Sequence, residues 1–205
     1  MPLKKPLSAS RSCPESFADV STDCHQDESD RWPRPTDSGP GIDHGGGEIE
    51  IVVDFDLDDF DPSPRLLASL QSAVRTAAQH RGISAGKIGV LVTDDVTIRE
   101  INRRHLEHDY ATDVISFTYH RQGDCVEGEL VVSLTTARRT AAELGWDWSH
   151  ELLLYVTHGT LHICGLEDTT DGERRRMREA ESDVLIRLGI ADARRYSPDQ
   201  AVPTR

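Results

Sequence analysis

The stretch HGTLHICGLED, residues 158–168, joins a helical pattern to a helix stop. His158 and His162 are four residues apart, so on an α-helix their imidazoles lie about 40° apart around the axis and face one point. Gly165 can end that helix in a left-handed turn and reverse the chain. A side chain of the following loop then returns over the two histidines. The stretch therefore predicts a helix and a loop that together could hold a metal.

Outward from this stretch, apolar patterns and turn residues predict alternating strands and helices. The expected strands cover residues 48–55, 87–93, 114–119 and 128–133. Five helices are expected. The first begins at Ser63 and Pro64 and stops at Gly82, and the second is capped by Thr93 or Asp94 and runs through Leu106. The third runs from Thr135 to Gly145, the fourth is capped by Ser149 and stops at Gly165, and the fifth runs from Asp171 to Gly189. This order excludes a strict βαβ alternation and a barrel. We predict an α+β fold, a four-stranded mixed sheet with packed helices, and a zinc site on a helix and the loop after it.

Composition divides the chain into three parts. Residues 1–47 are rich in proline and glycine, have few periodic apolar positions and predict a disordered leader. Residues 48–190 carry the predicted strands and helices and form the expected folded domain. Residues 191–205 are polar again and predict a flexible tail. A chain of 205 residues is long enough for one such domain with a real core.

The charge and the cysteines exclude several classes of protein. A net charge of −13 argues against a uniformly basic surface that coats nucleic acid, although a local basic patch is still compatible with it. The four cysteines form no C-x-x-C pair, which argues against a disulfide framework. The sequence shows neither a signal peptide nor an apolar run long enough to cross a membrane. We therefore expect a cytoplasmic protein with no membrane partner.

The third metal ligand has three candidates in the loop after the helix. They are Glu167, Asp168 and Asp171, and each offers an oxygen that zinc accepts. Taken alone, the two histidines would more often be ordinary core or surface residues, because a histidine pair is weak evidence for a metal.

A family resemblance adds to this interpretation. The stretch 158–168 resembles the H-G-x-L-H-x-x-G-[Y]-[D]-H signature of the YbeY family of bacterial endoribonucleases and rRNA maturation factors. INRRHLEHDYATDVISF (101–117) is similar to that family's L-N-x-x-[YW]-R-x-x-D-x-x-T-D-V-L-S-F, GELVVS (128–133) to its G-D-I-x-I-S, and Met177 and Glu181 match its M-x-x-x-E. The resemblance covers residues 48–190. It implies one Zn²⁺ per chain, with His158 and His162 as ligands and Asp168 where the family usually has histidine.

The sequence departs from the family at a second place. The resemblance implies an arginine after the aromatic residue of N-x-x-[YW]-R, and here that position is Leu106. Arg103 and Arg104 lie just before it, and a long guanidinium side chain could still reach a phosphate. We therefore take Arg103 and Arg104 as the catalytic candidates. The alternative is that both are ordinary solvated charges at the end of a helix.

The resemblance implies a zinc-dependent, single-strand-specific endoribonuclease in 16S rRNA 3′-end maturation and ribosome quality control. Its partners would be single-stranded or ribosomal RNA and the small ribosomal subunit. Zinc with three protein ligands lowers the pKa of a bound water and polarises a phosphoryl oxygen. A metalloprotease is disfavoured, because Gly159 stands where such enzymes have a glutamate base. That glycine either leaves room for a bulky substrate or serves packing. The competing hypothesis is a non-catalytic, zinc-stabilised ribosome-assembly factor.

RNA contact would need basic groups near the metal. A set of arginines could bind the RNA backbone, or it could form an ordinary salt-bridged helix face. These arginines are Arg103, Arg104, Arg138, Arg139, Arg174, Arg175, Arg176 and Arg178. The carboxylate ligand also predicts a higher pH optimum than a site with three histidines, because it leaves the metal less positive.

Overall fold

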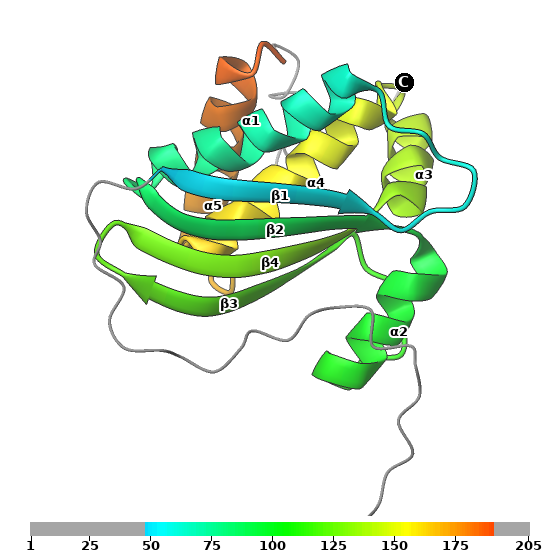
Figure 1. Ribbon diagram of the computed structural model, residues 1–205, viewed down its shortest axis with the longest axis horizontal. Coiled ribbons are helices and arrows are strands. Elements are labelled where there is room, and N and C mark those ends of the chain that lie inside the picture. The colour runs from blue at the N-terminus through cyan, green and yellow to red at the C-terminus, as the bar shows by residue number, and fades with distance from the viewer. Residues whose placement is uncertain (1–47, 191–205) are drawn as a thin grey trace, which may run out of the picture. The chain divides into compact units, whose positions relative to one another are not determined.

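Four strands form one mixed sheet in the computed structural model, which describes residues 48–190 (Figure 1). They are β1 (Ile49–Phe55), β2 (Ala85–Thr93), β3 (Val114–Gln122) and β4 (Cys125–Ser133). The order across the sheet is β1-β2-β4-β3. Parallel pairing joins β1 to β2 and β2 to β4, whereas β3 and β4 form an antiparallel hairpin. The predicted mixed four-stranded sheet is confirmed.

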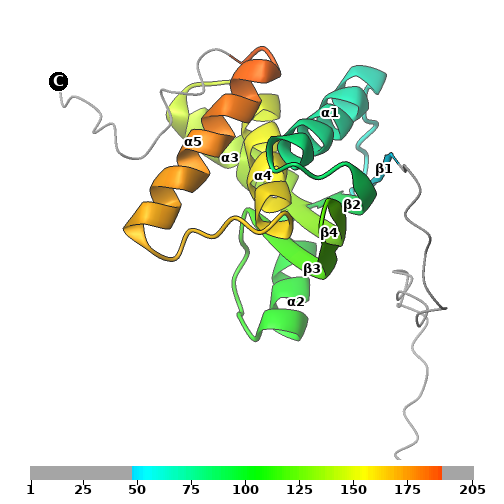
Figure 2. The same ribbon diagram turned by 90° about the vertical axis from the view of Figure 1, so that its left-hand side faces the viewer.

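Five helices pack on this sheet in the predicted order. They are α1 (Pro64–His80), α2 (Asp95–Leu106), α3 (Leu134–Leu144), α4 (Trp148–Ile163) and α5 (Asp171–Arg187). Figure 2 shows α1, α3, α4 and α5 on one side of the sheet and α2 on the other. The described part of the chain therefore has the α+β fold that the sequence predicts.

The strand alternation divides the core between the two faces of the sheet. On β4, Leu130 and Val132 are buried in the main core with Leu152 and Val156 of α4. The intervening Val131 faces the other way and packs with Ile98 of α2 and with Ile115. Because α4 lies in the main core, its position over the sheet is fixed by packing.

Three helix starts agree with the sequence and two differ from it; α5 begins at Asp171, as expected. Ser63 caps α1 and Asp94 caps α2, each accepting a hydrogen bond from a backbone N–H of the first turn. Ser133 caps α3, so this helix begins before the expected Thr135. Asp147 caps α4 in place of Ser149, because its Oδ1 accepts the Ser149 N–H at 2.8 Å and hydroxyl at 2.6 Å.

Three strands are longer than the sequence predicts. β2 begins at Ala85, β3 continues to Gln122 and β4 begins at Cys125. The additional residues pair with one another, as Ala85 does with Cys125 and Gln122 also does with Cys125. Strand partners thus extend the sheet into polar sequence where local composition predicted a loop.

The predicted leader (1–47) and tail (191–205) lie outside the described residues. Within residues 48–190, no helix combines the length and the apolar character needed to cross a bilayer.

Candidate metal centre

Two histidines of α4 and one aspartate of the loop after it meet at a single point. The Nε2 atoms of His158 and His162 are 3.0 Å apart. Asp168 brings one carboxylate oxygen to 3.9 Å from His158 Nε2 and the other to 3.8 Å from His162 Nε2. In the described part of the chain, these are the three residues whose donor atoms cluster closely enough to hold a metal ion.

The spacing of these donor atoms fits a tetrahedral ion. Zinc bonds nitrogen and oxygen ligands at about 2.1 Å, so two corners of a tetrahedron lie about 3.4 Å apart. The two Nε2 atoms are closer than this, at 3.0 Å, and the nearer Asp168 oxygen is 3.9 Å from His158 and 3.8 Å from His162. These two distances involve different oxygens, and one donor atom from each residue lies within 4.8 Å of the other two. Three protein ligands would leave a fourth corner open, which is the arrangement of a catalytic rather than a structural zinc site.

A turn at Gly165 returns the chain to the histidines, as the sequence predicts. Gly165 has φ +85°, in the left-handed region that favours glycine. Its N–H donates to the carbonyl of His162 at 2.8 Å, and the Leu166 N–H donates to the carbonyl of Leu161 at 2.9 Å. This is the Schellman pattern of a helix end. The buried Leu166 anchors the reversed chain, so that Asp168 faces the histidines.

The other two candidates for the third ligand lie elsewhere. Glu167 lines a hollow beside the histidines, and its whole residue is exposed. Asp171 has a side chain that is 98% exposed and forms an ion pair with Arg174. Of the three candidates, the structure brings Asp168 to the histidines.

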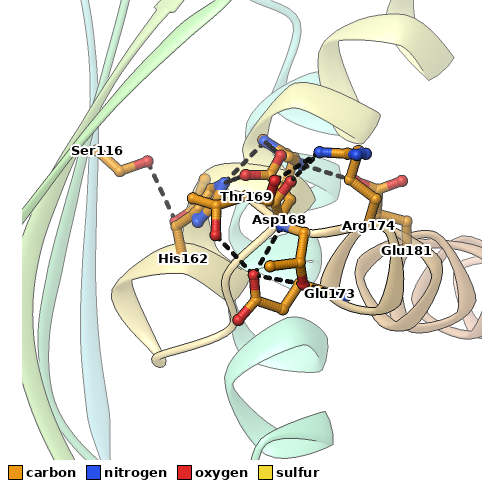
Figure 3. A network of polar contacts seen from close by, with 10 residues as sticks. Ser116, His162, Asp168, Thr169, Glu173, Arg174 and Glu181 are labelled. Atoms are coloured by element: carbon orange, nitrogen blue, oxygen red, sulfur yellow. Dashed lines mark hydrogen bonds and ion pairs between the residues drawn. The ribbon is translucent and has the colours of Figure 1, made fainter.

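A second carboxylate stands behind His158. Glu181 of α5 places its Oε1 2.6 Å from His158 Nδ1, and its side chain is 16% exposed (Figure 3). A carboxylate accepts a hydrogen bond from Nδ1–H, which leaves the Nε2 lone pair toward Asp168 and His162. No role for Glu181 was predicted from the sequence, although its place in the M-x-x-x-E pattern was a signal for one.

The two imidazoles have opposite pKa shifts. Burial alone would lower the pKa of His158, but the hydrogen bond and charge of Glu181, with the charges of Asp113 and Asp168, outweigh it and raise the pKa. The pKa of His162 is lowered by burial and then by the charge of His158. Two imidazoles this close are not readily both positively charged, and a neutral His162 is the form that binds metal.

Hollows open on two sides of the cluster and share His158 and Asp113. One hollow, of about 360 Å³, lies toward β3 and the end of α2 and is lined by Leu106, Ser116 and Thr118 among others. The second, of about 280 Å³, lies toward α5 and is lined by Arg174 and Arg178 among others. The proposed metal position is therefore reached from two sides.

Leu106 lines the first hollow, where the family pattern has arginine. Its residue is 45% exposed. Arg103 and Arg104 both pair with Glu100 on the same helix, at 2.7 and 2.8 Å, and are not among the described residues that line this hollow. The structure thus places the two candidates in ion pairs on α2 and does not bring them into this hollow. Glu100, three and four residues before them, was the sequence signal for this pairing.

The other basic candidates fall into two groups. Arg138 stacks over the rings of Phe60 and Trp148, and Arg139 pairs with Asp95 at 2.7 Å, so both take part in contacts away from the three clustered donors. Four more arginines follow the ligand loop on α5: Arg174, Arg175, Arg176 and Arg178. Two of these four, Arg174 and Arg178, line the second hollow.

Gly159 serves packing and does not open space above the metal. A Cβ atom at this position would lie 2.6 Å from Leu130 Cδ2, 2.9 Å from Val114 Cγ2 and 3.0 Å from Ser116 Oγ. The residue therefore faces the sheet, and α4 approaches β3 and β4 closely because it has no side chain there. Of the two interpretations of this glycine, the structure supports close packing.

Several known proteins similar in sequence to this chain share one name. A family model described as Endoribonuclease YbeY matches residues 57–189. Relatives of that name come from Rhodopirellula baltica (48% identical over 59% of this chain and 63% of the relative) and Bacteroides thetaiotaomicron (41%, over 55% and 81%). Another, from Desulforamulus reducens, is 33% identical over 69% of this chain and 99% of the relative.

A solution structure of a Thermotoga maritima protein matches 76% of this chain and 99% of its own, with a TM-score of 0.48 and 22% identity. The family model covers more than half of the chain, and the relatives agree with it in name. The chain therefore belongs to the endoribonuclease YbeY family.

Proposed function

We propose that this protein is a zinc-dependent endoribonuclease that cuts single-stranded RNA. The observation that carries the proposal is the convergence of His158, His162 and Asp168 beside open hollows, in a chain of an endoribonuclease family. The ligand set consists of nitrogen and oxygen donors, which suits zinc. When bound, the metal would supply an activated water and a Lewis acid for a phosphoryl oxygen.

The chain's own residues would bind and orient the RNA around that centre. The hollows on both sides of His158 give an unpaired strand a way across the cluster, with a phosphate beside the three donors. Unpaired RNA can splay its bases away from the backbone, which a duplex cannot. This arrangement supports the preference for single strands.

Arg103 or Arg104 is proposed to steady the phosphate during cleavage. Both guanidinium groups are bound to Glu100 without RNA, but exposed ion pairs of this kind contribute little to stability. A phosphate would therefore displace Glu100 at small cost, and arginine binds phosphate with two parallel hydrogen bonds.

The proposed cellular role is 16S rRNA 3′-end maturation and ribosome quality control in the cytoplasm. The substrate would be the rRNA of the small ribosomal subunit, and that subunit would be the partner to which the protein binds. Membership of the endoribonuclease YbeY family supports this role.

A second candidate function is a ribosome-assembly factor in which zinc is structural and no RNA is cut. Leu106 favours it, since an aliphatic side chain cannot bind a phosphate where the family pattern has arginine. The pairing of Arg103 and Arg104 with Glu100 favours it as well.

One experiment separates the two candidates. Purified protein loaded with zinc is offered a labelled single-stranded RNA, with His158→Ala as the control for contaminating nuclease. Cleavage that disappears in His158→Ala supports the enzyme, whereas binding to the small subunit without cleavage supports the assembly factor. Metal analysis of Asp168→Ala tests the third ligand, because stoichiometric zinc retained in this variant would contradict the assignment.

A further inference from the structure

Helix α5 places two polar side chains behind the clustered donors. Arg174 and Glu181 are seven residues apart, which is about two helical turns, so they lie on the same side of α5. Glu181 reaches His158, and Arg174 reaches the loop that carries Asp168. We propose that Arg174 and Glu181 are positioning residues that hold His158 and Asp168 in the geometry that binds metal. This inference rests on the proposed metal site.

Glu181 determines which nitrogen of His158 is free. Its carboxylate lies 2.6 Å from Nδ1, where it accepts the Nδ1–H and fixes the plane of the ring. The lone pair is then on Nε2, the atom that faces His162 and Asp168. Without this acceptor the imidazole would be free to rotate and to move its proton to Nε2, and that tautomer cannot bind metal through Nε2.

Arg174 holds the loop through its backbone. One terminal nitrogen donates to the carbonyl oxygens of Asp168 at 3.2 Å and Thr169 at 2.7 Å, while the other binds the Asp171 carboxylate (Figure 3). A single planar guanidinium thus spans the ligand residue, the residue after it and the first residue of α5. These contacts fix the peptide of Asp168 relative to α5.

A second set of hydrogen bonds fixes the same loop to the helix start. Thr170 and Glu173 form a reciprocal capping box, in which the Thr170 N–H donates to Glu173 Oε2 at 2.9 Å and the Glu173 N–H donates to Thr170 Oγ1 at 3.3 Å. The Thr169 hydroxyl also donates to Glu173 Oε2, at 2.7 Å. The loop therefore moves with α5, so the helix sets the position of Asp168.

The helix itself is fixed by packing. Its buried residues Met177, Ala180 and Val184 form one cluster with Leu161 of α4 and Leu166 of the turn. Leu161 precedes His162, so the same apolar contacts set α5 against the part of α4 that carries the histidines. Glu181 and Arg174, which contact His158 and Asp168, are thus held at a fixed separation by α5.

The test measures metal affinity directly, by competition with a chromophoric chelator, and the Co²⁺ absorption spectrum as a report on ligand geometry. Loss of a hydrogen-bonded carboxylate behind a ligating histidine typically weakens metal binding by about 10- to 100-fold. We expect a loss in this range for Glu181→Ala and a smaller loss for Glu181→Gln, whose amide oxygen still accepts the Nδ1–H. For Arg174→Ala we expect a loss of about tenfold, with a partial return in Arg174→Lys.

Two exposed neighbours on the same helix provide matched controls for metal affinity. Glu179→Ala and Arg175→Ala remove the same charges as Glu181→Ala and Arg174→Ala, so they separate positioning from a general change in charge. We expect both to bind metal within about twofold of the wild type. Urea denaturation of each variant without metal shows whether the fold is retained.

Three outcomes decide the proposal. Weaker metal binding and an altered Co²⁺ spectrum in folded Glu181→Ala and Arg174→Ala, with unchanged controls, support it. Wild-type affinity in both variants overturns it, including the case in which Arg174→Ala changes only RNA affinity and Arg174 contacts phosphate instead. If the wild-type protein binds no metal, the proposed metal site itself fails, and the measurement on the unmodified chain shows this separately.

Discussion

The substitution Gly159→Ala should destabilise the protein, because α4 has no room for a side chain where it meets the sheet. The added methyl carbon would lie 2.6 Å from Leu130 Cδ2 and 2.9 Å from Val114 Cγ2. Carbon atoms in contact are normally about 3.5–4.0 Å apart. Leu130 is 0% exposed and cannot swing into solvent, so α4 or β4 has to move.

The expected size follows from two opposing effects. Overpacking of a filled core costs about 1–3 kcal/mol. Alanine in place of glycine within a helix returns about 1 kcal/mol. Because the closest neighbour is fully buried, we expect a net loss of about 1–2 kcal/mol in the free energy of unfolding.

A second glycine provides the matched control. At Gly172 in the first turn of α5, a Cβ atom would have Arg176 Nη1, the end of a flexible side chain, as its neighbour at 3.6 Å. Gly172→Ala should therefore stabilise the protein, by up to about 1 kcal/mol. Urea denaturation of both variants measures the difference. If Gly159→Ala is as stable as the wild type or more stable, the close contact between α4 and the sheet is wrong.

Three further predictions concern charge. Asp168→His removes the negative charge of the third ligand and should shift the acidic limb of the pH–rate profile to lower pH; an unchanged limb would refute the charge argument. Burial raises the pKa of Glu151, because the ionised carboxylate is disfavoured inside the folded protein. The folded state therefore loses stability as pH rises through that raised pKa. Glu151→Gln should remove this loss and stabilise the protein more at pH 7 than at pH 4, as thermal unfolding at the two pH values would show; equal effects at both would contradict it. Burial alone would raise the pKa of Asp95, but its hydrogen bonds with Ser133, Thr136 and Arg139 outweigh it and lower the pKa, so its contribution is present above the ordinary aspartate pKa and lost as pH falls through the lowered value. Asp95→Ala should therefore cost about 1–2 kcal/mol at neutral pH and less in acid, and a loss independent of pH would refute this account.

The fold was predictable because its signals are local. The order of strands and helices follows from apolar periodicity and from caps such as Ser63. The predicted boundaries were wrong where two cap residues compete, since Asp147 rather than Ser149 caps α4. They also failed where pairing with a neighbouring strand decides, as at Gln122, because a hydrogen-bonded partner holds polar residues in the sheet.

The three clustered donors were also predictable from local signals, whereas the contacts that depend on tertiary packing were not. His158, His162 and Asp168 lie in one short stretch whose spacing and glycine turn bring them together. Glu181 and Arg174 were missed as supports because their contacts depend on how α5 packs against α4. Such packing is a tertiary property that no local pattern contains.

The location of all three donors within residues 158–168 also affects how metal and folding are coupled. A short segment with two histidines and an aspartate keeps some affinity for metal when the chain is unfolded, because its donors stay near one another in the sequence. A ligand stabilises a protein only by the difference between its affinities for the folded and unfolded states. Added zinc should therefore raise the melting temperature less than its affinity for the folded protein alone implies. The size of that rise measures how much of the affinity comes from the ordered turn at Gly165 and from the helix behind it, rather than from the three side chains themselves.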